Sequence, residues 1–139
     1  MSAEAWLAQL HENGYRITKA RGAVVEVMQG SHRALTPVEV YDLARKKYRA
    51  LGLVTVYRTL EKLEELSLVQ RVHQAAGCQA FISACQGHQH LLICEGCGQI
   101  AFFDGDDVEP LIRSVSKKTG YEIKEHWLQL FGLCENCRA

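Results

Sequence analysis

Two Cys-x-x-Cys pairs, Cys94/Cys97 and Cys134/Cys137, constrain the fold of this 139-residue chain more than any other feature. Each pair predicts a tight turn that directs two thiols at one ion. Two such turns together predict a closed tetrahedral site of the kind that holds structural zinc. The 36 residues between the pairs exceed the spacing of a compact zinc ribbon. One strand, one helix and a further strand would account for them and return the chain to its starting edge.

Redox chemistry and disulfide formation are the alternatives for these four thiols. All six cysteines lie between residues 78 and 137, and in a reducing compartment paired thiols at this spacing suit a metal better than disulfides. A thioredoxin-like dithiol would open a helix after a strand, whereas a strand is expected after Gly98. Structural zinc is therefore the preferred interpretation.

The first 83 residues are predicted to begin with three short helices whose ends are marked by capping signals. An apolar face over residues 6–10 predicts the first helix, which the Asn-Gly pair at 13–14 would end. Thr18 would cap a second helix. The third would begin at Thr36, with Pro37 in its first turn and a capping-box glutamate three residues after the threonine.

A fourth helix is expected over about residues 55–66, where apolar residues recur at helical spacing and form one buried stripe. Hydroxyls and cations are expected on its outer face, which suits a groove of DNA. Solvated helix faces of this composition are the common alternative. The outer face consists of Thr55, Arg58, Thr59 and Lys62.

Residues 68–73 and 78–83 are predicted to form a hairpin with residues 74–77 as its turn. Helices followed by a hairpin make a winged helix-turn-helix, in which Arg71 would contact phosphate. The charge distribution agrees with a DNA-binding front: residues 1–83 carry 11 basic and 8 acidic side chains, whereas residues 84–139 carry 5 and 8.

From Gly87 onward the pattern changes to strands around one helix. Residues 88–93 and 99–103 are expected to flank the first cysteine turn as a second hairpin, and residues 121–133 to form a long last strand. Between them a helix would open at Asp106 and Asp107 and close at Gly120. Its expected buried face is Val108, Leu111, Ile112 and Val115.

Histidines supply a second candidate metal site. His88 and His90 lie two residues apart on a predicted strand and therefore share a face. Glu109 and His126 could join them, and two or three imidazoles with one carboxylate match zinc, ferrous iron or manganese. A surface pair without a metal is the alternative for the two histidines.

A further set of candidate ligands lies at the end of the first hairpin. With residues 74–77 as the turn, His73 and Cys78 are expected to face each other, and Cys85 could reach either histidine group. A thiolate ligand would favour zinc over iron. Alternatively, Cys78 and Cys85 are small buried apolar residues, as free cysteines usually are.

Several motifs, taken together, resemble those of the ferric uptake regulator family, from about residue 8 to the end. The resemblance implies a dimeric, metal-dependent transcriptional repressor of α+β fold, which binds double-stranded DNA at a palindromic operator. It implies an N-terminal winged helix-turn-helix domain over residues 1–83, a hinge at 84–87 and a C-terminal α/β dimerisation and metal-binding domain over 88–139. The motifs are Gly14-Tyr15-Arg16-Ile17-Thr18 with Arg21, Thr55-Val56-Tyr57-Arg58-Thr59-Leu60, His88-x-His90, Cys94-x-x-Cys97-Gly98 and Phe131-Gly132-Leu133-Cys134-x-x-Cys137.

The resemblance also implies roles for single residues. Tyr57 and Arg58 match the DNA-reading positions of the family, and Arg16 and Lys19 are further candidate DNA contacts. The four paired cysteines match its structural zinc site. A further metal site found in several members has the order and spacing of His88, His90, Glu109 and His126.

The chain departs from iron and peroxide sensors of the family where those usually place ligands. Ala34 stands in place of a histidine, Ile82 in place of a carboxylate, and the apolar run 100–103 in place of another carboxylate. Cys85 resembles a cysteine of zinc-uptake regulators, about one residue later than in those proteins. A zinc-responsive repressor controlling metal uptake is therefore expected. An iron- or peroxide-responsive regulator, with Fe²⁺ or Mn²⁺ as the regulatory ion, is the alternative.

Other classes fit the sequence less well. A zinc-dependent deaminase needs a glutamate two residues after a histidine and a proline before its paired cysteines, and no nucleophile with an adjacent base indicates a hydrolase. A structural zinc adaptor would explain the thiols but not the cationic helix face. Because these catalytic patterns do not fit, the protein is not expected to be an enzyme. The chain shows no membrane-length apolar run or signal peptide, so a cytoplasmic protein is expected.

Overall fold

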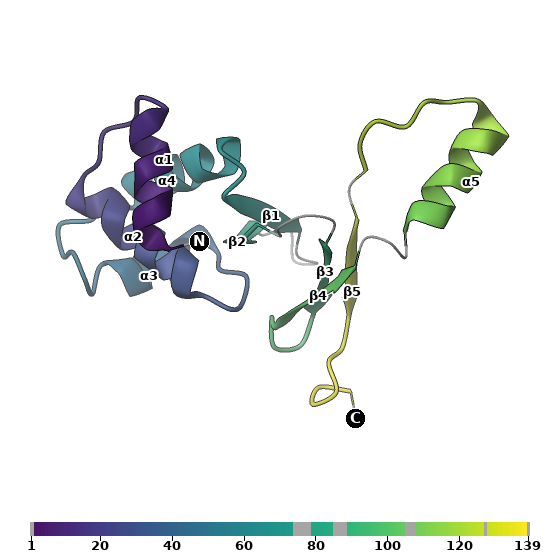
Figure 1. The fold of residues 1–139 in the computed structure, drawn as a ribbon. Helices are drawn as coiled ribbons and strands as arrows, with labels where there is room; N and C mark the ends of the chain where they lie inside the picture. The colour runs from purple at the N-terminus through teal and green to yellow at the C-terminus, as the bar shows by residue number, and fades with distance from the viewer. Residues whose placement is uncertain (1, 74–78, 85–88, 105–107, 127, 139) are drawn as a thin grey trace. The chain divides into compact units, whose positions relative to one another are not determined.

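The computed structural model describes residues 2–73, 79–84, 89–104, 108–126 and 128–138. The chain divides into two compact units, residues 1–84 and 85–139, and its fold is α+β (Figure 1). Within the described residues, no helix combines the length and apolar character that a membrane span requires.

Helices make up most of the first unit: α1 (Ala3–Glu12), α2 (Lys19–Gly30), α3 (Pro37–Ala44) and α4 (Leu53–Glu65). The predicted caps are confirmed. Thr18 accepts a hydrogen bond from the Arg21 N–H, and Thr36 forms a reciprocal capping box with Glu39. The predicted start of α4 is wrong by two residues, because the helix begins after Gly52, whose backbone adopts the cap conformation without a side-chain hydrogen bond.

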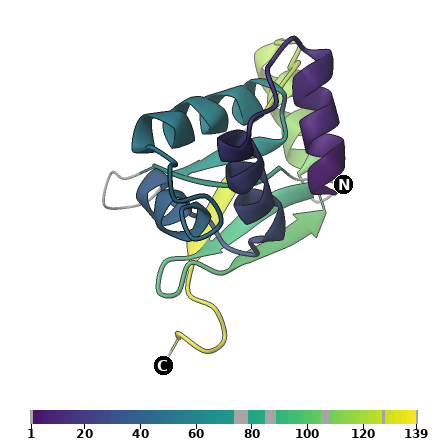
Figure 2. The ribbon, with the colours of Figure 1, turned by 90° about the vertical axis from the view of Figure 1, so that its left-hand side faces the viewer.

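Apolar faces of the four helices meet in one core. In Figure 2, α1 (purple) lies against α2 at one side of this core and α4 (teal) covers another side. Burial of such side chains contributes roughly 1.5–3 kcal/mol each to folding. Among the fully buried side chains are Leu10, Val24, Val25, Met28, Leu35, Val40, Val56, Leu60 and Leu63.

A hairpin of β1 (Val69–His73) and β2 (Gln79–Ser83) follows α4. Leu35 extends it by exchanging two backbone hydrogen bonds with Phe81, and the arrangement of helices and hairpin confirms the predicted winged helix-turn-helix. The register pairs His73 with Gln79. The prediction that His73 faces Cys78 is therefore wrong by one position, and Cys78 lies outside the described residues.

The second unit contains β3 (Gln89–Cys94), β4 (Ile100–Asp104), α5 (Glu109–Thr119) and β5 (Gln129–Gly132). The strand order is β4-β3-β5, with β4 antiparallel and β5 parallel to the central β3. The predicted hairpin around the first cysteine pair is confirmed, and Gly120 ends α5 in the left-handed conformation, as expected. The prediction of a long last strand is wrong: among the described residues 121–126 and 128–133, only 129–132 are paired in the sheet.

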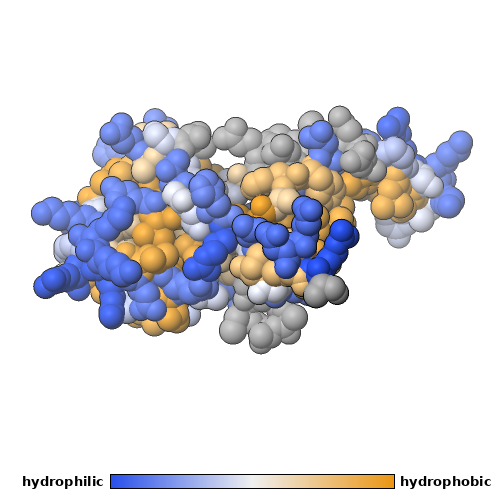
Figure 3. Space-filling view, turned by 90° about the horizontal axis from the view of Figure 1, so that it is seen from below, coloured by the Kyte–Doolittle hydropathy of each residue, from blue (hydrophilic) through white to orange (hydrophobic). Residues whose placement is uncertain are grey.

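The apolar face predicted for α5 is buried only at Val108, which lies directly before the helix; Ile112 is partly exposed. None of the residues of α5 is buried, and Leu111 and Val115 are 62% and 41% exposed. The periodicity of the helix is correct, but nothing in the described part of this single chain covers it. Apolar side chains of the sheet are exposed as well, and such residues are visible at the surface in Figure 3. They include Leu92, Phe102, Leu130 and Phe131, and Leu133, directly after β5, is exposed as well.

Candidate metal centre

The first cysteine turn follows directly from the end of β3. The Cys94 N–H donates to the Gln99 carbonyl at 2.9 Å, and the Gly98 N–H donates to the Cys94 carbonyl at 2.9 Å. Gly98 has a φ of +78°, a left-handed conformation that glycine adopts without steric strain. The turn also brings the Cys97 N–H to 3.5 Å from the Cys94 sulfur.

The second cysteine turn follows β5. Backbone N–H groups of Cys137 and Arg138 both donate to the Cys134 carbonyl at 3.0 Å. Because β5 is parallel to β3 and Gly132 lies opposite Cys94, the two strands finish at the same end of the sheet, and both cysteine turns begin there. The Cys134 N–H consequently donates to the Cys94 sulfur at 3.3 Å.

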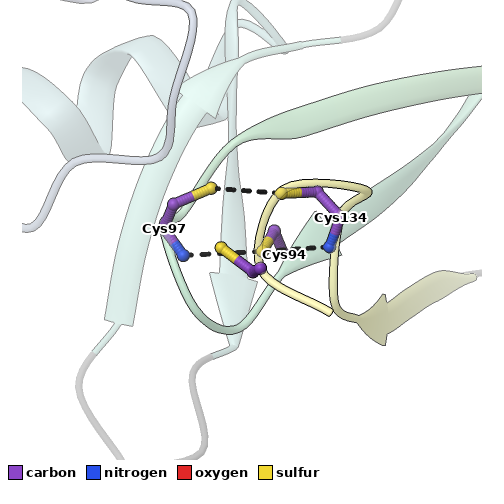
Figure 4. A group of neighbouring side chains, drawn as sticks. Cys94, Cys97 and Cys134 are labelled. Atoms are coloured by element: carbon purple, nitrogen blue, oxygen red, sulfur yellow. Dashed lines mark hydrogen bonds between the residues drawn. The ribbon is translucent and has the colours of Figure 1, made fainter. Parts of the chain in front are cut away.

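The four sulfur atoms of Cys94, Cys97, Cys134 and Cys137 lie within 4.8 Å of one another, and all four thiols are free. Figure 4 shows the two turns facing each other, with 3.8 Å between the sulfurs of Cys97 and Cys134. Four sulfurs bonded at about 2.3 Å to a tetrahedral zinc ion lie about 3.8 Å apart. The donor set therefore fits structural zinc.

Electrostatics at this centre favour a cation. Backbone N–H groups of Cys134 and Cys97 donate to the Cys94 sulfur and lower the pKa of that thiol to about 6. The neighbouring sulfurs of Cys134, Cys94 and Cys97 raise the pKa of Cys137 to about 12. One thiolate is thus stabilised by the backbone, whereas further thiolates repel it. A divalent cation removes this repulsion, because it attracts all four thiolates.

Gly96 allows the two turns to approach closely. A Cβ at this position would lie 3.0 Å from the sulfur and 3.1 Å from the Cβ of Cys137. We expect Gly96→Ala to lower the free energy of unfolding by about 1–3 kcal/mol through overpacking, and to weaken zinc retention. The measurement is a thermal melt together with zinc content after dialysis against a chelator.

Gly132→Ala is the matched control for Gly96→Ala, because a Cβ at Gly132 meets nothing within 4 Å and its φ is not positive. The control should melt close to the wild type. Equal effects of the two substitutions would contradict a specific close approach at Gly96.

Two of the predicted histidine ligands converge in the second unit. His90 lies on β3, His126 precedes β5, and their Nε2 atoms are 3.1 Å apart. The two rings are tilted by 48°, with their centroids 5.0 Å apart, and the Phe103 ring lies beside His90. A metal ion bonded at about 2.0–2.1 Å to two imidazole nitrogens separates them by about 3.3 Å in tetrahedral geometry. The pair therefore has the spacing of two ligands of one ion.

Of the remaining predicted ligands, Glu109 is the one whose side chain the structure describes, and it does not join this pair. Glu109 is the exposed first residue of α5. Among the described residues, the four cysteines are the one group of three or more potential ligands close enough to share an ion. His88, Cys78 and Cys85 lie outside the described residues, as does the side chain of His73.

Polar and cationic side chains lie on the exposed side of α4 and at the start of α2. Tyr57 is 46% exposed, Arg58 is exposed, and Thr55 and Lys62 are partly exposed. Arg16 and Lys19 are also exposed.

The Lys62 ammonium lies 5.3 Å from the centre of the Tyr15 ring, and the Tyr15 hydroxyl donates to Glu65 at 2.8 Å. Sequence reasoning missed this link between α4 and the segment before α2.

The structure corrects one predicted DNA contact, Thr59, and shows an ion pair at another, Arg71. Thr59 is 0% exposed, and its hydroxyl donates to the Thr55 carbonyl at 2.7 Å, so the prediction that it lies on the outer face is wrong. The guanidinium of Arg71 is paired with both oxygens of Glu64 at 2.7 and 2.9 Å, and it stacks over Phe81. This ion pair joins β1 to the C-terminal end of α4, and the side chains of Arg71 and Glu64 are 36% and 34% exposed.

Comparison with known proteins agrees with this architecture. The model of the ferric uptake regulator family matches residues 12–131. The chain belongs to the ferric uptake regulator family. Members of this family are metal-responsive transcription regulators that bind DNA as dimers and are not enzymes, and the chain shares this role. The specific metal differs between members.

Relatives with different regulatory roles resemble the chain to a similar degree. The ferric uptake regulation protein of Bacillus subtilis is 32% identical over 135 residues, covering 94% of this chain and 91% of that protein. The peroxide operon regulator of the same species is 29% identical over 131 residues, covering 94% and 90%. The Helicobacter pylori ferric uptake regulator, whose structure reveals three functional metal-binding sites, superposes with a TM-score of 0.81 at 26% identity, covering 100% and 95%.

Proposed function

We propose that this member of the ferric uptake regulator family is a zinc-responsive repressor that controls metal uptake. The observation that carries the proposal is the pair of imidazoles, His90 and His126, whose Nε2 atoms lie 3.1 Å apart, close to the spacing of two nitrogen ligands of one ion. Nitrogen donors suit zinc, whereas manganese prefers oxygen donors. Ala34 and Ile82, where iron sensors usually have ligands, are buried apolar residues, which supports the same assignment.

The two metal sites would have different roles. Structural zinc would be held by the four paired cysteines. The regulatory ion would be held by His90 and His126, and it would cross-link β3 to the segment before β5. The further proposed ligands are His88 and Glu109, and the additional candidates are Cys85, Cys78 and His73. Residues 84–87 would serve as the hinge between the DNA-binding domain and the dimerisation domain.

The DNA-binding surface would consist of side chains on α4 and at the start of α2. Their cations would contact phosphate and base edges of a palindromic operator in the cytoplasm.

A second copy of the chain would cover the exposed apolar residues of α5 and the sheet. In the metal-loaded dimer, the two α4 helices would be held at the separation of two half-sites, which increases DNA affinity. The proposed contacts are Tyr57, Arg58, Thr55, Lys62, Arg16 and Lys19.

An iron- or peroxide-responsive regulator is the second candidate, because the ferric uptake and peroxide regulators of Bacillus subtilis are 32% and 29% identical to the chain. Both candidates bind DNA, and they differ in the ion that raises DNA affinity. The experiment is a titration of protein that retains its structural zinc with Zn²⁺, Fe²⁺ or Mn²⁺. DNA affinity is measured on a duplex recovered by in vitro selection.

We expect Zn²⁺ to raise DNA affinity by roughly 5–150-fold, the usual size of allosteric coupling, at lower free-metal concentrations than Fe²⁺ or Mn²⁺. His126→Ala should lose this gain but keep one zinc ion per chain, because the cysteines remain. His11→Ala, which removes an exposed histidine of α1, is the matched control and should behave as the wild type. Equal or tighter DNA binding with Fe²⁺ would reject the zinc assignment.

A further inference from the structure

Val54 is the most exposed apolar residue of α4, with 63% of its surface accessible. It lies in the first turn of the helix, directly after Leu53. The buried side of α4 is formed by other apolar residues, Val56, Leu60 and Leu63, which are all 0% exposed. Core packing therefore does not account for a β-branched side chain at position 54.

The helical position of Val54 places it with the proposed DNA contacts. At about 100° per residue, Val54 lies between Tyr57 and Arg58 in angle and one turn before them. Val56, about 200° away from Val54, points into the core. Val54, Tyr57 and Arg58 thus form one continuous exposed strip at the N-terminal end of α4.

An exposed valine alone carries no information, because much of any protein surface is apolar. Its place in the fold gives it meaning here. The N-terminal residues of the second helix of a helix-turn-helix contact base edges in the major groove. A valine can neither donate nor accept a hydrogen bond, and the one apolar group that a base edge presents in that groove is the C5-methyl of thymine.

We propose that Val54 is a specificity-determining residue that contacts the C5-methyl group of a thymine in each operator half-site. This inference rests on the proposed DNA-binding surface. It adds a contact that selects for thymine by apolar burial, beside Arg58 and Tyr57, which offer hydrogen-bonding groups. Lys62, two turns after Val54 on α4, would hold phosphate, and Arg58 would contact a neighbouring base edge, which leaves base selection at this position to the valine.

Uracil substitution tests the contact directly, because deoxyuridine lacks the methyl group of thymine and keeps its hydrogen-bonding groups. The probe is the duplex recovered by in vitro selection with the zinc-loaded wild-type protein. Each thymine is replaced by deoxyuridine symmetrically in both half-sites. Burial of one methyl group is worth about fourfold in affinity, so two half-sites give roughly 15-fold. We expect a loss of this size at one thymine position of each half-site.

The variant Val54→Ala should bind the thymine duplex roughly 15-fold more weakly and lose no further affinity when uracil replaces that thymine. This non-additivity is the signature of a direct contact. Val54→Ile should keep the preference for thymine. If Val54→Ala retains the wild-type preference at every thymine, the inference is overturned. If the wild-type protein itself selects no specific duplex, the proposed DNA-binding function falls, and this inference falls with it.

Discussion

Replacement of one thiol, by Cys134→Ser, is expected to abolish zinc binding at the four-cysteine centre and to unfold the sheet of the second unit. The two cysteine turns are joined by only a few backbone hydrogen bonds, including the one from the Cys134 N–H to the Cys94 sulfur. Structural zinc contributes apparent free energies of roughly 10–16 kcal/mol in small zinc domains. That contribution equals or exceeds the total stability of a typical domain. Three thiols and a hydroxyl cannot supply it.

The expected result is a fall of the zinc content by one ion per chain, with loss of strand signal in circular dichroism and loss of the dimer in sedimentation. Glu135→Gln is the matched control, since Glu135 is an exposed residue of the same turn and carries no sulfur. A Cys134→Ser protein that keeps its zinc and melts within a few degrees of the wild type would contradict a structural role for the ion.

Replacement of Arg58 by alanine is expected to abolish sequence-specific DNA binding. A single arginine that contacts a base edge contributes about 1–3 kcal/mol. A dimer presents each side chain twice, so the expected loss is roughly 2–6 kcal/mol, or about 30-fold to 10⁴-fold in affinity. Arg58 is exposed on α4, and none of the salt bridges within the described residues involves it.

The measurement is the dissociation constant of the selected duplex at several salt concentrations, with zinc present. Lys117→Ala, which removes one positive charge from the side of α5 opposite Leu111 and Val115, controls for the change in net charge and should alter the affinity little. Unchanged binding by Arg58→Ala would favour a structural zinc adaptor over a DNA-binding regulator.

Local signals in the sequence predict the helices of the first unit well. Thr18 and Thr36 act through atoms three residues away, so the caps that they form can be read without knowledge of the fold. The start of α4 could not be read in this way. Thr55 looks like a cap because of its hydroxyl, whereas the structure uses the backbone of Gly52.

Errors on α4 and the hairpin have a tertiary cause. α4 packs against α2, α3 and β1, so its buried arc is wider than one apolar stripe and includes Thr59. The hydroxyl of Thr59 donates a hydrogen bond to the Thr55 carbonyl, so the buried hydroxyl does not lose its hydrogen-bond partner. Likewise, Arg71 meets Glu64 only because β1 lies beside the end of α4, a contact that spacing along the chain does not reveal.

In the second unit, the spacing of the cysteines indicated that two turns supply the ligands of one ion. The structure agrees, because it brings the four sulfur atoms together. The exposed face of α5 differs from expectation because burial was assigned within one chain, whereas β5 is short because it pairs with β3 only over residues 129–132. The apolar side chains that periodicity places inside a core here face outward, where a dimer partner can cover them.

The register of β3 fixes the number of residues that can separate His90 from Cys94. His90 and Cys94 lie on β3 only four positions apart, about 13 Å along the strand, and Leu91 and Ile93 between them are buried while Leu92 is exposed. Insertion or deletion of a single residue between them would turn His90 to the opposite face and separate it from His126. An exposed side chain such as Leu92 can therefore be replaced at little cost, but the number of residues between His90 and Cys94 is fixed.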